Sequence, residues 1–288
     1  MIANSLARFH IQDGMEPEQS KRLQSPLRKL RKSLKKIAKK VTPKRTHDLR
    51  THVRQSETVV SVALDGTREG KRLLKAVKPL YKMAGKVRDM DVLTTLAATV
   101  ESDGEEECMA QLLEALVSWR ERAVRKLQSA VTHDRRKIDR HLRQCGARIE
   151  KEFAAAGGQS QNGGGPPGAN PVALRLAAKL GASPSLGPQN LHPYRRKVKE
   201  LRYLLTLAGD EDAKLTETLG DVKDAIGTWH DWAELDDIAA KVLDHGPQCK
   251  LRKQIESAAK SHFDQALSQA SALQKKSFRR AAAARRSR

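Results

Sequence analysis

Aromatic residues and cysteines are scarce in this chain of 288 residues. Phe, Trp and Tyr together make up 3% of it, which argues against a protein that binds single-stranded nucleic acid by stacking bases on aromatic rings. The three cysteines, Cys108, Cys145 and Cys249, are far apart in the sequence. They predict neither a disulfide framework nor a Cys-x-x-Cys metal site, so we expect ordinary thiols, no metal and no cofactor.

Long apolar runs are lacking as well. No run approaches the roughly 20 residues that a membrane span needs, and Met1–Gly14 has no apolar centre of the kind found in signal peptides. We therefore expect a cytoplasmic protein without a membrane partner.

Acidic residues are few compared with basic ones. The chain has 34 Asp and Glu against 55 Lys and Arg, a formal net charge of +21, and a field of this sign attracts polyanions. The excess is densest between Lys21 and Arg54, where 14 basic residues stand beside a single acid, Asp48. Like charges one helical turn apart destabilise a helix by roughly 0.2–0.5 kcal/mol per pair, so this density favours a bound anion over a plain solvated surface.

Apolar residues recur at spacings of three and four through most of the chain, a pattern that predicts an all-α fold. After the turn at Ser102–Glu107 we expect one long helix and then a second one from about Asp134 to Phe153. Gly157–Gly168, rich in Gly, Gln and Pro, predicts a flexible linker. Helix starts are predicted where a capping residue, alone or followed by proline, precedes an apolar stripe. These sites are Ser25-Pro26, Thr42-Pro43 and Thr67.

One pattern of histidine and basic residues occurs twice. His47, Arg50 and Arg54 share one helix face, and His192, Arg195 and Lys199 repeat this spacing 145 residues later. A lone histidine at a helix start is more often a local capping or packing residue, but its recurrence before the same cations favours a ligand-binding role. The neighbouring apolar positions match at the same offset: Leu49, Val53, Ser56 and Val60 with Tyr194, Val198, Leu201 and Leu205.

A second pair of segments matches at an offset of 142 residues. Gly85 falls on Gly227, and Asp89 falls on Asp231. Two consecutive helices that repeat in order predict an internal duplication of a helical unit. The matched apolar positions are Leu73, Val77, Leu80, Ala84 and Val87 in the first copy, and Leu215, Leu219, Val222, Ile226 and Trp229 in the second.

With these motifs the chain resembles the CHAD family, the conserved histidine α-helical domain, over roughly residues 18–277. The resemblance implies two pseudo-symmetric antiparallel helical bundles around a basic groove or pore that binds inorganic polyphosphate. It rests on the two histidine stripes, the second extended by Arg202, and on the Gly-x-x-Arg-Asp-x-Asp-Val run formed by Gly85, Arg88, Asp89, Asp91 and Val92.

The expected organisation follows from the repeat. We predict a flexible N-terminus (1–17), a first CHAD helical repeat (18–156), a Gly/Pro-rich linker (157–170), a second repeat (171–277) and a basic tail (278–288).

The predicted polyphosphate-binding residues are the basic and histidine side chains of these helices. Arg is expected to grip phosphate oxygens with its fork and Lys to act as a point charge. The cationic stripe of the first repeat has no counterpart in the second, where Glu217 and Asp224 stand at two of the matching positions, so we expect the first repeat to make most contacts. The full set is Arg28, Lys32, Lys35, Lys36, Lys39, His47, Arg50, Arg54, Lys71, Lys75, Lys78, Lys82, Arg88, Arg175, Lys179, His192, Arg195, Arg196, Lys199 and Arg202.

Two other functions fit the sequence less well. A nucleic-acid-binding protein that contacts the phosphate backbone is the second choice, because the net charge fits it while no zinc-finger, RRM-type or helix-turn-helix signature occurs. A metal-dependent phosphohydrolase is disfavoured, because the His-Asp pairs His47-Asp48, His133-Asp134 and His230-Asp231 do not recur at matching positions. We expect a non-catalytic protein that associates with polyphosphate granules.

Overall fold

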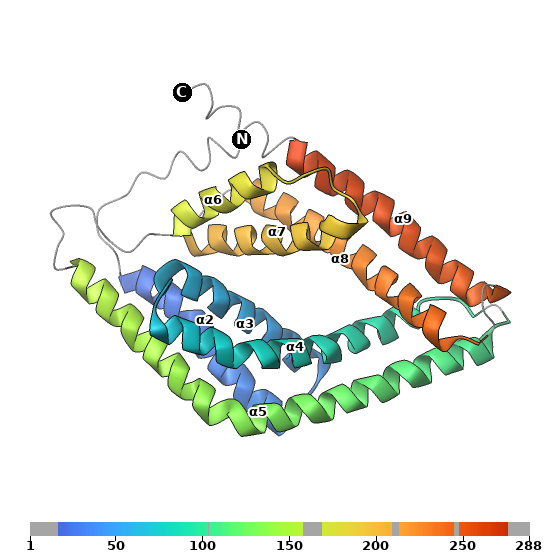
Figure 1. Cartoon of the computed structure of the whole chain (residues 1–288), viewed down its shortest axis with the longest axis horizontal. Coiled ribbons are helices and arrows are strands. Elements are labelled where there is room, and N and C mark those ends of the chain that lie inside the picture. Colours follow the sequence, from blue (N-terminus) through green and yellow to red (C-terminus); the bar gives the residue numbers. More distant parts are fainter. Residues whose placement is uncertain (1–16, 103, 158–168, 209–212, 245–247, 276–288) are drawn as a thin grey trace. The chain divides into compact units, whose positions relative to one another are not determined.

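The computed structural model describes residues 17–102, 104–157, 169–208, 213–244 and 248–275. These residues form eight α-helices and no strand (Figure 1), which confirms the all-α class. No helix among them is long and apolar enough to cross a bilayer. The helices are α2 (Pro17–Lys39), α3 (Pro43–Ala63), α4 (Arg68–Ala97), α5 (Glu106–Gly157), α6 (Ala169–Gly181), α7 (Pro188–Ala208), α8 (Ala213–Val242) and α9 (Lys250–Leu273).

Three predicted flexible segments fall almost entirely outside the described residues: the N-terminus 1–17, the linker 157–170 and the tail 278–288. Where their edges are described, at Pro17, Gly157 and residues 169–170, the chain is helical.

The chain divides into two compact units. Of the described residues, one unit combines 17–88 with those of Arg120–Val172, and we call it the N-unit. The other combines those of Asp89–Trp119 with those of 173–275, and we call it the C-unit. Helices α4 and α5 therefore each contribute one part to either unit. Helices α3 and α7 have 21 residues each, and α4 and α8 have 30 each. The duplication and its boundaries stay predictions.

The N-unit buries the apolar faces that the sequence predicts. The stripe of α2 is buried at Leu30 and Ile37, that of α3 at Leu49 and Val53, and that of α4 at Leu80. Between α2 and α3 the Ser33 hydroxyl lies 2.7 Å from His52 Nδ1. The charged faces of these helices are left at the surface, so burial of the apolar stripe fixes where the cations point.

The C-unit has its own core, in which the ends of α4 and α5 pack with α8 and α9. Leu93 and Leu112 are fully or almost fully buried there together with Leu235, Leu251 and Ile255. Farther along α7 and α8, the repeated positions Tyr194, Val198, Leu201, Leu205, Leu215, Leu219, Val222 and Ile226 are all buried as well.

The predicted start of α3 is confirmed. Thr42 precedes the helix, its hydroxyl oxygen accepts the Arg45 N–H at 3.3 Å, and Pro43 is the first helical residue. Thr67 likewise caps α4, because its hydroxyl oxygen accepts the Gly70 N–H at 3.2 Å.

Two expectations about helix boundaries are wrong. Helix α2 begins at Pro17 and runs through Ser25-Pro26, because burial of Leu23 and Leu27 on either side offsets the hydrogen bond that an internal proline removes. Helix α5 is one helix of 52 residues rather than two. The stretch between its predicted halves holds neither glycine nor proline, and the apolar period continues through the buried residues Leu127, Val131 and Ile138.

Candidate anion-binding site

Two arginines of α3 share one tyrosine of α4. The guanidinium carbons of Arg50 and Arg54 each lie 4.7 Å from the centre of the Tyr81 ring. Arg54 Nε donates a hydrogen bond to the Tyr81 hydroxyl at 2.9 Å, and another of its nitrogens pairs with Glu57 at 3.1 Å. The attraction between a cation and the ring face holds both guanidinium groups in place despite their like charge.

The Arg54 side chain is held and yet accessible. Burial alone would lower its pKa, but Tyr81 and Glu57 outweigh burial and the pKa is raised, so the group stays charged. Its side chain keeps 38% of its surface exposed. A fixed cation with free donor edges suits a phosphate oxygen better than a mobile lysine does, because less side-chain entropy is lost on binding.

The predicted lysine stripes of the N-unit lie at the surface. On α2 the exposed residues are Arg28, Lys32, Lys35, Lys36 and Lys39; on α4 they are Lys71, Lys75, Lys78 and Lys82. Near the start of α4, a shallow depression is lined by Gly66, Arg68, Lys71, Arg72 and Lys75. Arg88 at the end of this part of α4 is half-buried. Convergence of the stripes on one groove stays a prediction.

The histidine that packs between helices in this unit is not the predicted one. His47 is exposed, whereas His52 is half-buried against Ser33. Burial lowers the His52 pKa, and the charges of Lys29 and Lys36 lower it further against the opposing effect of Asp48. The protonation of His52 is therefore disfavoured by the cations of α2. Sequence reasoning missed it because Lys197 stands at the matching position of the second copy.

In the C-unit, the arginines of α7 lie against glycines of α8. Arg195 Nε donates to the Lys223 carbonyl oxygen at 2.9 Å, and a Cβ atom at Gly227 would come within 2.5 Å of the Arg195 guanidinium. A Cβ atom at Gly220 would lie 3.8 Å from the guanidinium carbon of Arg202, and Arg202 Nε is buried without a hydrogen-bond partner among the described residues. The repeated glycine at position 227 thus leaves room for a guanidinium group.

His192 pairs with a histidine that the sequence analysis did not place in the binding site. The His192 and His230 ring centres are 4.2 Å apart, and His192 Nδ1 is buried without a hydrogen-bond partner among the described residues. Burial, His230 and the α7 cations Arg195, Arg196 and Lys199 lower the His192 pKa to about 4. Burial and Arg195 also lower the His230 pKa, against the opposing effect of Asp89.

This histidine pair predicts that the protein loses stability in mild acid. The unfolded chain takes up a proton at His192 near pH 6.5, whereas the folded chain does so only near pH 4. The stabilisation is therefore complete above pH 6.5 and is lost as the pH falls toward 4. The free energy of unfolding, measured with urea, should be lower at pH 5 than at pH 7. We expect His192 to contribute about 1 kcal/mol to this difference, after allowance for its half-exposed position.

The matched variants are His192→Gln and, as a control, the exposed His133→Gln. The first should shrink the difference in unfolding free energy between pH 7 and pH 5, while the second should leave it unchanged. Saturating polyphosphate should also shrink it in the wild type, since a bound anion supplies the counter-charge that His192 lacks. An identical pH dependence in wild type and His192→Gln contradicts this assignment.

The remaining predicted residues of the C-unit, Arg175, Lys179, Arg196 and Lys199, are exposed. On α8, Lys223 pairs with Asp224 at 2.6 Å. Lys223 also stands where the second repeat would carry the counterpart of Tyr81. Sequence reasoning missed Tyr81 and His230 as neighbours of the predicted binding residues, because Lys223 and Arg88 stand at the matching positions of the other copy.

Fold and site together define an all-helical protein with cationic helix faces and half-buried arginines suited to a polyanion. The sequence model of the CHAD domain matches residues 21–240. The match spans more than half of the chain, which therefore belongs to the CHAD domain family. No curated protein and no solved structure gives a significant match.

Proposed function

We propose that this protein binds inorganic polyphosphate without catalysing a reaction on it. Membership of the CHAD domain family is consistent with a polyphosphate-related function. The net charge of +21 and the exposed stripes of α2 and α4 fit a ligand that is a long chain of negative charges. We further propose that binding targets the protein to polyphosphate granules or organises the polymer there.

The observation that carries the proposal is the placement of Arg50 and Arg54 on Tyr81. Both guanidinium groups lie 4.7 Å from the same ring centre. Arg forms two parallel hydrogen bonds with a phosphate group. A pair of such groups held in place matches successive phosphates of a polymer, and the lysine stripes extend the contact as point charges.

A binding role requires only that charges be held in a fixed pattern. Each exposed lysine adds a small, salt-screened attraction, and many of them add up along a polymer. Affinity should therefore rise with polyphosphate chain length and fall steeply with salt.

The test is a competition at about 0.15 M salt, where the Debye length is roughly 8 Å. Labelled long-chain polyphosphate is bound to the full chain and then challenged with duplex DNA at equal phosphate concentration. We expect DNA to leave most of the label bound, because rigid duplex DNA cannot adapt its phosphates to the pattern of cations as a single flexible phosphate chain can. Ready displacement would favour the alternative, a protein that binds nucleic acid through its phosphate backbone.

A further inference from the structure

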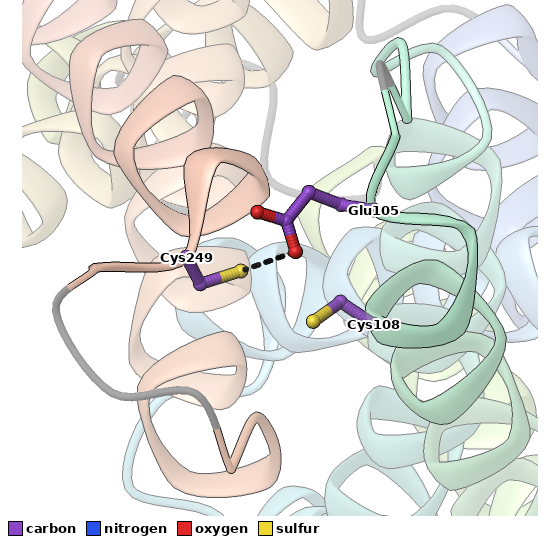
Figure 2. A group of neighbouring side chains, drawn as sticks. All are labelled: Glu105, Cys108 and Cys249. Atoms are coloured by element: carbon purple, nitrogen blue, oxygen red, sulfur yellow. Dashed lines mark hydrogen bonds between the residues drawn. The ribbon is translucent and has the colours of Figure 1, made fainter.

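Two cysteines that are distant in the sequence meet in the C-unit. Cys108 lies in the first turn of α5 and Cys249 stands directly before α9, and each is only 2% exposed. Glu105, just before α5, lies beside them. One ligand atom from each residue lies within 4.8 Å of the other two, and Figure 2 shows the three side chains pointing toward one another.

The Glu105 carboxylate is oriented by the backbone. Its Oε1 atom accepts the Lys250 N–H at 3.0 Å, and its Oε2 atom accepts the Cys249 thiol at 3.8 Å. One oxygen is thus anchored at the start of α9 while the other faces the sulfur atoms (Figure 2). Anchored ligands of this kind are typical of metal sites, in which a hydrogen bond fixes the orientation of each ligand.

The group brings together three acidic side chains that repel one another once ionised. A cation removes this repulsion, because it replaces the thiol protons and neutralises the thiolates.

We propose that Glu105, Cys108 and Cys249 bind a zinc ion. Zinc binds thiolates at about 2.3 Å and carboxylate oxygens at about 2.0–2.2 Å, which places tetrahedral ligand atoms roughly 3.5–3.8 Å apart. The distance of 3.8 Å between Cys249 Sγ and Glu105 Oε2 fits this spacing. Two thiolates select zinc over magnesium and calcium, which prefer oxygen ligands.

Binding displaces the protons of both thiols to solvent, and the three protein ligands leave a fourth tetrahedral position for water. The ion ties the start of α9 to the start of α5 and so stabilises the C-unit. No contact with polyphosphate is involved, and the zinc site is independent of the anion-binding site.

The test is a cobalt titration of the untagged full chain, kept reduced and first stripped of metal by a chelator. Tetrahedral cobalt bound to thiolate gives an intense near-ultraviolet charge-transfer band and visible d–d bands. We expect both to saturate at one cobalt per chain and to vanish when one equivalent of zinc is added. The zinc form should also melt about 5 °C or more above the stripped form.

The variants Cys108→Ser and Cys249→Ser should lose the charge-transfer band, and Glu105→Gln should weaken cobalt binding at least tenfold. Cys145→Ser is the matched control, because Cys145 is equally buried but lies in the N-unit; it should bind cobalt as the wild type does. The wild-type spectrum tests the proposal even if a variant fails to fold. Absence of the band in the reduced wild type, or a band that survives both Cys108→Ser and Cys249→Ser, overturns it.

Discussion

Replacing four half-buried arginines by alanine is expected to weaken polyphosphate binding at least about 100-fold. Hydrogen bonds to charged groups contribute roughly 1.5–3 kcal/mol each, and even partial loss at four positions exceeds the 2.7 kcal/mol or so that corresponds to this factor. Affinity is measured by fluorescence anisotropy with labelled long-chain polyphosphate at about 0.15 M salt. The four residues are Arg50, Arg54, Arg195 and Arg202.

Position matters in this prediction more than the number of charges. A control quartet on one face of α5 removes the same number of charges from exposed arginines: Arg125, Arg136, Arg140 and Arg143. We expect the control quartet to weaken binding less than tenfold, because exposed cations contribute only long-range attraction. If both quartets lose affinity equally, the protein binds polyanions through its general surface charge rather than through a defined site.

Two of these positions, Arg50 and Arg54, can be tested for geometry as well as for charge. Arginine-to-lysine replacements keep the charge, but they remove the planar guanidinium group that can form two parallel hydrogen bonds and lie against the Tyr81 ring. We expect an intermediate loss of affinity for Arg50→Lys combined with Arg54→Lys. Thermal melting of each variant separates loss of binding from loss of folding.

The buried faces of the helices were predictable from the sequence because they follow a simple period. The matched apolar residues of α3 and α7 are all buried, and the Thr42-Pro43 start of α3 is where the capping rule places it. Such features depend only on neighbours within one helix. The prediction at Ser25-Pro26 was wrong for the same reason: the local rule does not include the packing that carries α2 through Pro26.

Features that depend on long-range contacts were not predictable. The Tyr81 ring that holds Arg50 and Arg54 lies on another helix, and His230 meets His192 only because α7 packs on α8. Cys108 and Cys249 looked like separate ordinary thiols because no spacing rule relates residues so far apart. The sequence pointed to which helix faces carry charge, while only packing decides which of those charges are held in place.

The second large expected effect is that the two units contribute unequally to polyphosphate affinity. Replacing Lys75, Lys78 and Lys82 by alanine should weaken polyphosphate binding about tenfold or more, whereas replacing Arg175 and Lys179 should weaken it less than threefold. All five side chains are exposed, so differences in folding contribute little. Both variants are measured by the anisotropy assay at the same salt concentration.

The physical reason lies in what stands beside each set of cations. Lys78 is one helical turn from Tyr81 and therefore extends the surface that carries Arg50 and Arg54. In the C-unit, α8 instead presents Asp224, which pairs with Lys223 and would repel a phosphate chain. The double variants Lys78→Ala/Lys82→Ala and Arg175→Ala/Lys179→Ala each remove two charges, and the two residues of each pair lie one helical turn apart. Their comparison therefore matches both the number and the spacing of the charges removed. If the α6 pair proves the more important, the lysine stripe of α4 is a solvated face and binding must centre on the arginines of α7.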